Sequence, residues 1–218
     1  MSVRWGFLGA GMIAQKALAP AVHAADGAVL QAVAARSLDR AAGLEPAGSV
    51  YGDYAALLDD PDVDAVYIAL ANDAHVPWAV RALEAGKHVL CEKPLGLDAA
   101  QTEQAYAASD KTGRLLVEAS WYRWHPRTQR SSSLVSSGAI GEVVSVETAF
   151  CFTGVAEGNY RLDPAMGGGA LYDVGHYALS GALWALGDSA AVVSATARWS
   201  GDAHGEGVDL VTDAQLAA

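Results

Sequence analysis

The fold is decided near the N-terminus, by the stretch VRWGFLGAGMIA at residues 3–14. Its apolar first half predicts a strand, which runs into the turn Gly9-x-Gly11-x-x-Ala14 and then into a helical pattern. Gly9 permits a tight turn, Gly11 lets the backbone approach a pyrophosphate, and the small Ala14 lets the helix pack close to the strand. Backbone N–H groups at the helix start would bind the phosphates. The residues expected to hold a dinucleotide here are Gly9, Gly11, Met12 and Ile13.

A glycine-rich turn without a ligand is the alternative interpretation, because this motif alone is a weak signal. A second apolar strand at residues 29–35 favours the dinucleotide site. In NAD sites an acidic residue after that strand holds the ribose 2′-hydroxyl. Arg36 and Ser37 take this place, and a guanidinium with a hydroxyl suits a 2′-phosphate. The sequence therefore favours NADP, with NAD still possible, over a merely solvated arginine that opens the next helix.

Short apolar segments alternate with helical patterns over residues 1–119. Further strands are expected at residues 49–51, 64–70, 88–91 and 115–119, and helices at 54–58, 76–85 and 98–112. Near-continuous apolar strands that alternate with helices predict an α/β fold with a parallel, doubly wound sheet. Residues 1–119 are thus expected to form a dinucleotide-binding Rossmann domain.

The pattern changes after residue 119. Helices are predicted at residues 126–136 and 170–186, and strands at 142–152, 191–199 and 208–216. The alternation of apolar and polar residues over residues 142–152 is strong enough to predict a long strand. Residues 120–218 are therefore expected to form a second domain of the α+β class, with longer and more separated strands.

Composition excludes several classes of protein. The chain has 218 residues, is 52% hydrophobic and carries a formal charge of -11, which suits a folded globule and argues against a nucleic-acid partner. No apolar stretch is long enough to predict a membrane span. Cys91 and Cys151 lack metal or redox spacing, so both are expected to be reduced, buried thiols. We expect no metal site, and the cytoplasm is the expected compartment.

Two motifs follow predicted strands at the carboxyl edge, where parallel sheets bind ligands. Asn72-x-x-His75 follows the fourth strand, and Glu92-Lys93-Pro94 follows the fifth. The predicted cofactor-binding residues of this edge are Asn72, His75, Glu92 and Lys93. The alternatives are a structural histidine at a helix start, a solvated lysine, and a glutamate that only partners the lysine or the backbone.

Two more motifs complete the set, WYRWHP at residues 121–126 and GGGALYDVGHY at residues 167–177. Together with the glycine turn at residues 9–14, these motifs resemble the Gfo/Idh/MocA oxidoreductases, the family of glucose–fructose oxidoreductase and inositol dehydrogenase. The resemblance covers nearly the whole chain and includes AGKHV at residues 85–89. Residues 117–126 look most like the branch of dihydrodiol dehydrogenase and NADP-dependent xylose dehydrogenase.

The resemblance implies that Lys93 and Asp173 face the nicotinamide and the reacting alcohol, together with the residue at position 177. That residue is Tyr177, where many members have histidine, and His176 stands one place earlier. Asp173 and Tyr177 are four residues apart and share a face of a helix. Either Tyr177 or His176 could be the acid/base; spacing favours Tyr177.

The implied chemistry is hydride transfer between a carbinol carbon and nicotinamide C4, with proton transfer at the hydroxyl. Tyrosine is a weak base at neutral pH because its ordinary pKa is about 10, so a nearby ammonium such as Lys93 would have to stabilise the phenolate. Asp173 would orient the hydroxyl or the lysine. The expected substrate-binding residues are Trp121, Arg123 and Trp124. The indoles of Trp121 and Trp124 could stack on a sugar or aromatic ring, or they could simply be part of the hydrophobic core.

The resemblance implies that residues 120–218 are a substrate and oligomerisation domain with an open, mainly antiparallel sheet. Members of the family continue well beyond the equivalent of Ala218, so the sheet is expected to be incomplete here, and this chain is either truncated or a natural short form. A homodimer is expected if its sheet is sufficient. The leading hypothesis is an NADP-dependent oxidoreductase acting on a small sugar or cyclic diol. One alternative is a non-catalytic NAD(P)-binding sensor or partner protein that has lost turnover with the missing C-terminal sheet. Another is an NAD(P)-using enzyme of another reaction type, such as a lyase or glycosidase.

Overall fold

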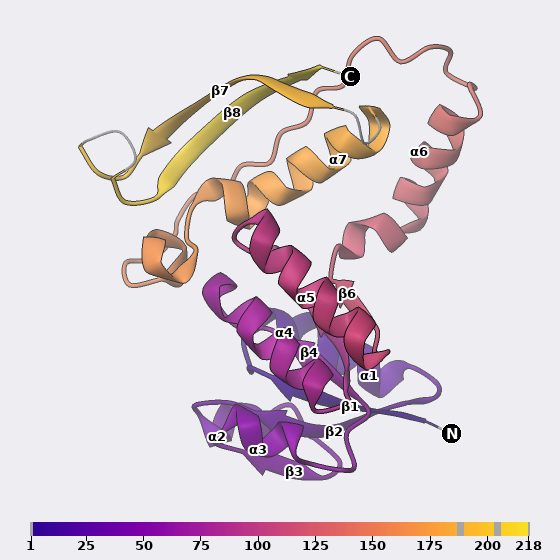
Figure 1. Cartoon of the computed structure of the whole chain (residues 1–218), viewed down its shortest axis with the longest axis vertical. Coiled ribbons are helices and arrows are strands. Elements are labelled where there is room, and N and C mark those ends of the chain that lie inside the picture. The colour runs from indigo at the N-terminus through magenta and orange to yellow at the C-terminus, as the bar shows by residue number, and fades with distance from the viewer. Residues whose placement is uncertain (1, 187–189, 203–205, 218) are drawn as a thin grey trace. The chain divides into compact units, whose positions relative to one another are not determined.

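The computed structural model describes residues 2–186, 190–202 and 206–217. The chain folds into two compact units, Met1–Ala119 and Ser120–Ala218, whose elements are labelled in Figure 1. The first unit contains a six-stranded parallel sheet, and the second contains two antiparallel strands. The predicted fold class, a Rossmann sheet followed by an α+β part with antiparallel strands, is therefore confirmed.

The parallel sheet has the strand order β3-β2-β1-β4-β5-β6. Its strands are β1 (Val3–Leu8), β2 (Ala28–Ala34), β3 (Ser49–Tyr51), β4 (Ala65–Ile68), β5 (His88–Cys91) and β6 (Leu116–Glu118). Leu8 at the end of β1 is in register with Ala34 on one side and Ile68 on the other. The order reverses between β1 and β4, and sheets of this kind bind ligands at the carboxyl edge beside such a switch point.

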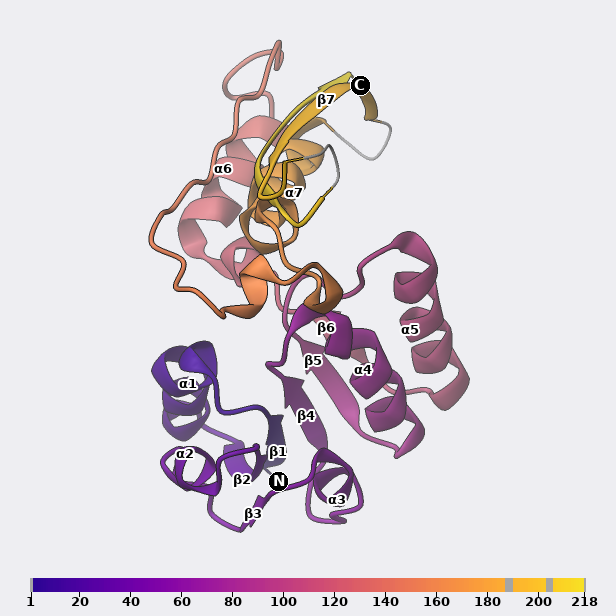
Figure 2. The same ribbon diagram turned by 90° about the vertical axis from the view of Figure 1, so that its left-hand side faces the viewer.

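Helices cover the two faces of this sheet (Figure 2). They are α1 (Ala19–Ala24), which continues a π-helical turn at Ala14–Leu18, α2 (Leu38–Ala42), α3 (Tyr54–Leu58), α4 (His75–Glu84) and α5 (Ala99–Thr112). Phe7 and Tyr67 pack with residues of α1 and α2, whereas Leu8 and Ile68 pack with residues of α3, α4 and α5. Burying each such side chain stabilises the fold by about 1.5–3 kcal/mol. The period-two alternation of the strands thus decides which helices each residue meets.

Helix α5 begins and ends where its sequence predicts. The Asp98 carboxylate accepts a hydrogen bond of 2.8 Å from the backbone N–H of Gln101, which satisfies an N–H that lacks an intrahelical partner. Gly113 ends the helix with φ at 64°, a left-handed conformation that a residue without Cβ adopts at little cost. Local chemistry alone therefore defines both ends of α5.

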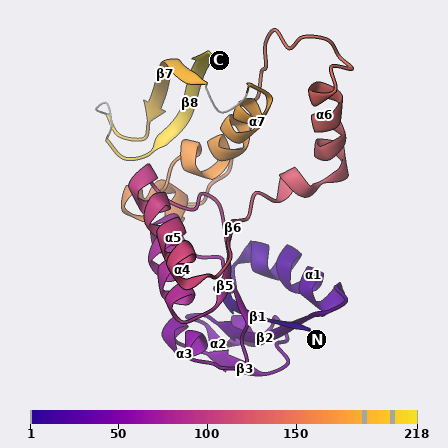
Figure 3. The ribbon, with the colours of Figure 1, turned by 45° about the vertical axis from the view of Figure 1, so that its right-hand side comes forward.

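The second unit begins with a 3₁₀ turn at Trp121–Trp124 and α6 (Pro126–Ser136). Two more 3₁₀ turns follow at Tyr160–Leu162 and Pro164–Met166; a π-helical turn at Leu171–Gly175 then leads into α7 (His176–Leu186). The strands β7 (Ala191–Trp199) and β8 (Asp209–Ala217) pair antiparallel. Figure 3 shows this hairpin with α7 alongside it.

The predicted strand at residues 142–152 is wrong. This segment is irregular chain, and Val144 is 92% exposed. Among the described residues β7 and β8 pair only with each other, so residues 142–152 have the alternation of a strand without a ladder to join. The expectation that both cysteines are buried is wrong for the same reason. Cys91 is buried in the Rossmann sheet, but Cys151 is exposed in this irregular segment.

An ion pair at the amino edge of the parallel sheet gives a prediction for stability. Arg4 donates from Nε and Nη2 to the Asp64 carboxylate at 3.0 and 2.8 Å. Its side chain and its backbone N–H together lower the pKa of Asp64 from 3.8 to about 2. Because the folded-state pKa is the lower one, this stabilisation is present above about pH 4 and is lost as pH falls towards 2.

We expect Asp64→Asn to lower the urea midpoint at pH 7, and the difference from the parent chain to shrink as pH falls from 5 to 3. Urea titrations at several pH values measure it. Asp62→Asn is the matched control, because Asp62 pairs with Arg4 only at an exposed Nη1. A pH-independent difference between Asp64→Asn and the parent chain would contradict the linkage.

Candidate active site

The glycine turn after β1 is shaped by the end of β4. Gly9 has φ at 100°, and a Cβ there would collide with the carbonyl oxygen of Ala69. Gly11 is different, because a Cβ built on it would meet only the Ala69 carbonyl oxygen, at 4.0 Å. The side chains of Met12 and Ile13 are exposed beside it. The turn therefore needs Gly9 for its own packing, while Gly11 leaves open room next to the backbone, which suits a pyrophosphate.

Arg40, a residue of α2 that was not predicted as a site residue, connects the segment after β2 to this turn. Arg40 donates from Nη2 to the Ala10 carbonyl at 2.6 Å, so its guanidinium lies at the glycine turn. Arg36 is exposed, and Ser37 caps α2 by accepting from the Arg40 backbone N–H at 3.3 Å. The predicted phosphate ligands Arg36 and Ser37 thus stay predictions, with Arg40 as a further candidate. Its only sequence signal is that it stands one helical turn after Arg36.

His75 joins the loops that follow β4 and β5. It is 1% exposed, and its ring nitrogens lie 2.7 Å from the Pro94 carbonyl and 3.2 Å from the Leu70 carbonyl. Burial lowers the pKa of His75, more than these two carbonyls raise it. Asn72 is also buried, and it begins the 3₁₀ turn Asn72–Ala74 that precedes α4. His75 therefore fastens the backbone next to Lys93, and a direct contact with a cofactor stays a prediction.

Glu92 and Lys93 stand directly after β5. The Tyr67 hydroxyl donates to Glu92 Oε1 at 2.7 Å. Burial raises the pKa of Glu92, although the Tyr67 hydrogen bond and the Lys93 charge act in the opposite direction. The far side of the loop is held by Glu118, whose carboxylate accepts from the Leu95 backbone N–H at 2.8 Å. The half-buried Lys93 is thus carried by a loop anchored on both sides.

Tyr177 of the second unit sits in a cluster of aromatic rings. Trp121 donates from Nε1 to the Tyr177 hydroxyl at 3.2 Å. The rings of Tyr122 and Phe150 lie 5.8 and 5.4 Å from the Tyr177 ring, centroid to centroid. The ring of the neighbouring His176 lies 5.5 Å from the Tyr177 ring, centroid to centroid, and its Nε2 lies 3.1 Å from Ser120 Oγ. The two acid/base candidates therefore have different polar partners, an indole N–H for the tyrosine and a serine hydroxyl for the histidine.

Asp173 is held by an arginine that the sequence analysis did not single out. It is 7% exposed, and Arg161 donates from Nε to its Oδ2 at 2.6 Å. The glycines at 167–169 explain how the Arg161 loop comes so close. The Gly169 backbone N–H donates to the Arg161 carbonyl at 2.9 Å, and a Cβ on Gly168 would clash with that carbonyl. The glycine run thus serves backbone packing around Asp173.

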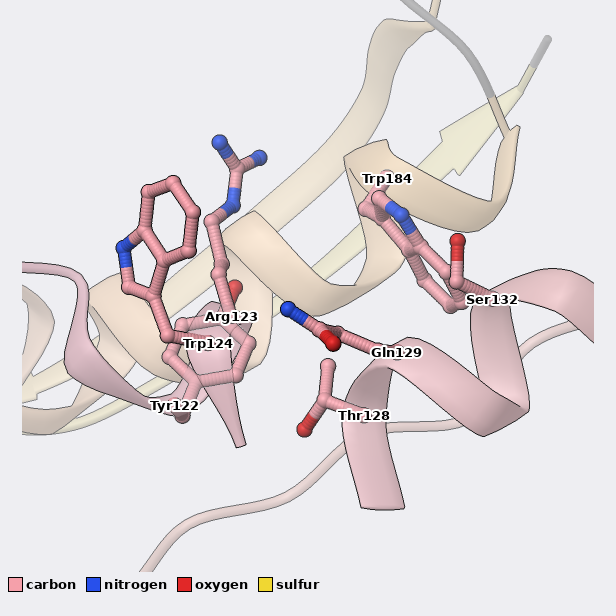
Figure 4. A pocket seen from close by; sticks show the side chains of 7 residues that line it. All are labelled: Tyr122, Arg123, Trp124, Thr128, Gln129, Ser132 and Trp184. Carbon is pink, nitrogen blue, oxygen red and sulfur yellow. The ribbon is translucent and has the colours of Figure 1, made fainter. Parts of the chain in front are cut away.

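A pocket of about 410 Å³ opens in the second unit, and two predicted substrate residues line it. Figure 4 shows Arg123 and Trp124 on one side and Trp184 of α7 on the other. Gln129 and its neighbours on α6 complete the wall. Trp121 lies outside this lining and contacts Tyr177 instead. The predicted substrate residues therefore divide between a ring-lined pocket and the Tyr177 cluster.

The structure gathers the predicted residues in two sets. The first unit brings Gly9, Gly11, Ser37, Asn72, His75, Glu92 and Lys93 to the carboxyl edge of the parallel sheet. The second unit contains Trp121, Arg123, Trp124, Asp173, His176 and Tyr177 in and around α7 and the turn before α6. Among the described residues no group of three or more histidines, cysteines or carboxylates could hold a metal ion.

Comparison with known families identifies the chain. Residues 3–120 match the profile described as an oxidoreductase family with an NAD-binding Rossmann fold, Gfo/Idh/MocA. Residues 128–217 match the Gfo/Idh/MocA C-terminal domain. The chain belongs to the Gfo/Idh/MocA oxidoreductase family, and the resemblance seen in the motifs is confirmed.

Relatives include both predicted branches. A D-xylose 1-dehydrogenase (NADP(+)) of Haloferax volcanii is 40% identical over 197 residues, 88% of this chain and 60% of that protein. A trans-1,2-dihydrobenzene-1,2-diol dehydrogenase of Xenopus laevis is 35% identical over 182 residues, 81% of this chain and 54% of that protein. A 3-ketoreductase from Actinomadura kijaniata, solved with NADP and TDP-benzene, superposes with a TM-score of 0.93 at 35% identity, covering 99% of this chain and 66% of that one.

The chain thus spans between 54% and 66% of the length of these three proteins. Within the part of the chain that the structure describes, no helix combines the length and apolar character needed to cross a membrane.

Proposed function

We propose that the protein is an NADP-dependent oxidoreductase that transfers a hydride between nicotinamide and a carbinol or carbonyl carbon of a small sugar or cyclic diol. The observation that carries the proposal is the glycine turn, where Gly11 leaves open room beside the backbone and the Arg40 guanidinium lies on the Ala10 carbonyl. A guanidinium at this position supplies charge-assisted donors for a 2′-phosphate. The names of the relatives support the same cofactor and a sugar or diol substrate.

Each predicted catalytic residue has a role in this proposal. The bound nicotinamide would supply or accept the hydride. The Lys93 ammonium would donate a hydrogen bond to the substrate oxygen as negative charge develops on it. Tyr177 or His176 would carry the proton to or from that oxygen. Asp173, held by Arg161, would orient the group that moves the proton.

The ring-lined pocket of the second unit suits a ligand with a flat face. Trp124 and Trp184 provide indoles, and Arg123 provides guanidinium N–H groups that can donate hydrogen bonds to hydroxyl oxygens. Sugars and aromatic diols both offer a face for stacking. We propose that Arg123 and Trp124 contribute to substrate binding through this pocket.

The first test is a fluorescence titration of the purified chain with NADP⁺ and NAD⁺, followed by a search for NADPH formation with pentoses, hexoses and cyclic diols. Tighter binding of NADP⁺ and reduction by one of these substrates is the expected result. Cofactor binding without reduction across the whole panel would favour the non-catalytic alternative. If a folded chain bound neither dinucleotide, the glycine turn would be purely structural and the proposal would be wrong.

We expect Arg40→Ala to weaken NADP⁺ binding about 10-fold relative to NAD⁺, because a charge-assisted contact to the 2′-phosphate is lost. The dissociation constants of both cofactors, measured for the same preparation, give this ratio. Arg81→Ala is the matched control, since Arg81 stacks on the Trp78 ring of α4 and its removal changes the net charge equally. Equal losses for NADP⁺ and NAD⁺ would mean that Arg40 only supports the turn.

A further inference from the structure

Tyr67 and Glu92 lie on the same face of the parallel sheet. Tyr67 of β4 is in register with Leu90 of β5, and both pack in the core that α1 and α2 cover. Glu92 stands two residues after Leu90, so the period of the strand directs it to that same face. The Glu92 backbone N–H donates to the Ile68 carbonyl at 2.9 Å, which continues the pairing of β4 and β5 up to Glu92.

The Tyr67 ring has little freedom to move. It is 0% exposed, and its centroid lies 4.9 Å from that of Phe7 in an edge-on contact. Ala10 and Ala14 of the glycine turn belong to the same core. A hydroxyl on so buried a ring requires a hydrogen-bond partner, and at 2.7 Å it donates to Glu92 Oε1. One rigid ring thus joins the core beneath the glycine turn to the carboxylate at the sheet edge.

The hydrogen bond from Tyr67 acts on the pKa of Glu92 together with the charged groups around that carboxylate. Lys93 attracts the carboxylate from its own loop and also donates its backbone N–H, whereas Glu118 of β6 repels it. Cys91, the preceding residue, is buried on β5, and burial raises the pKa of its thiol. Burial raises the pKa of Glu92 as well, and the Tyr67 hydroxyl is the strongest of the groups that lower it. Without that hydroxyl the carboxylate would lose both an anchor and part of the support for its charge.

We propose that Tyr67 is a positioning residue, whose hydroxyl holds the Glu92 carboxylate in one orientation as an acceptor for a ribose hydroxyl of the bound dinucleotide. The inference rests on the proposed function, because it requires a dinucleotide at this edge. An ionised carboxylate only accepts hydrogen bonds, and its charge strengthens the bond that it accepts from a hydroxyl group. Once it takes up a proton it is a weaker acceptor.

The test is the affinity for NADPH, measured by fluorescence from pH 5 to pH 9 for the parent chain and for Tyr67→Phe. The variant keeps the buried ring and removes only the hydroxyl. We expect about 5–10-fold weaker binding at pH 7, a loss within the net contribution of one typical hydrogen bond. The pH at which affinity falls on acidification should also move upwards, because the pKa of Glu92 rises further when its donor is lost.

Tyr51→Phe is the matched control. Its hydroxyl donates to Asp60 Oδ2 at 3.0 Å from β3, so the variant loses the same kind of bond away from Glu92. We expect no change in NADPH affinity or in its pH profile. Glu92→Gln should remove the acidic limb of the profile, and adding Tyr67→Phe to it should weaken binding less than twofold further, because coupled residues are not additive.

A Tyr67→Phe chain that binds NADPH with the parent's affinity and pH profile would overturn the inference and leave the proposed function intact. Absence of NADPH binding by the folded parent chain would overturn both. If Tyr67→Phe does not fold, Glu92→Asp takes its place, since it withdraws the carboxylate from the hydroxyl and leaves the buried ring untouched. Parent-like affinity of that variant would equally refute the role of Tyr67.

Discussion

Replacement of Tyr177 by phenylalanine is expected to lower kcat by about 10²–10⁴-fold, the usual contribution of a general acid/base. The dissociation constant of NADP⁺ should change by less than about threefold, because the ring and its contacts with Tyr122 and Phe150 remain. The indole N–H of Trp121 donates a hydrogen bond to the phenol oxygen of Tyr177. This bond would stabilise negative charge on that oxygen. Steady-state NADPH formation with the best substrate of the panel measures the effect.

His176→Gln is the companion variant, because His176 is the other acid/base candidate. Its Nε2 lies 3.1 Å from Ser120 Oγ, and an amide side chain can keep a hydrogen bond to that hydroxyl. We expect kcat to fall by less than about 10-fold, a value well below the loss for an acid/base group. A severe loss in His176→Gln together with an active Tyr177→Phe would assign proton transfer to the histidine.

Replacement of Lys93 by methionine is expected to lower kcat/KM by about 10²–10³-fold, the loss found when one donor to a developing oxyanion is removed. Methionine keeps much of the length and apolar bulk of the lysine stem, so the loop held by His75 and Glu118 should stay in place. The measurement is steady-state kinetics combined with a separate NADP⁺ titration, in which binding should change only a few-fold.

Lys111→Met is the control for Lys93→Met, since it removes the same charge from the last turn of α5. Lys93→Arg should restore only part of the activity, because a planar guanidinium cannot take the position of a compact ammonium. If Lys93→Met retained the kcat/KM of the parent chain, the lysine would be a loop residue without a part in the chemistry.

Much of the fold followed from local chemistry. Each strand of the first unit has β-forming apolar residues in a short run, and α5 has its Asp98 cap and its terminal Gly113. These signals depend only on neighbours in sequence, which is why the order of elements, and from it the parallel sheet, could be predicted. The segment at 142–152 shows the limit: alternation states which side chains could share a face, but a strand also requires a partner.

The candidate site divides in the same way. The motifs themselves predicted that Gly9, Asn72 and Lys93 would meet at one edge, since residues that follow parallel strands share that edge. Their supporting contacts were not predictable. Arg161 reaches Asp173 across 12 positions of sequence, and Tyr67 reaches Glu92 across 25.

Residue types, spacing and period therefore determined the class of fold and the candidate residues at the carboxyl edge of the parallel sheet, and the resemblance of the motifs to a known family added the catalytic candidates. Only tertiary structure decided that Arg40 lies on the glycine turn, that the glycines at 167–169 serve packing against Arg161, and that a buried tyrosine holds Glu92. The physical reason is that a hydrogen bond between distant residues depends on distances of about 3 Å. Such distances arise when helices and strands pack, and no local pattern of the chain encodes them.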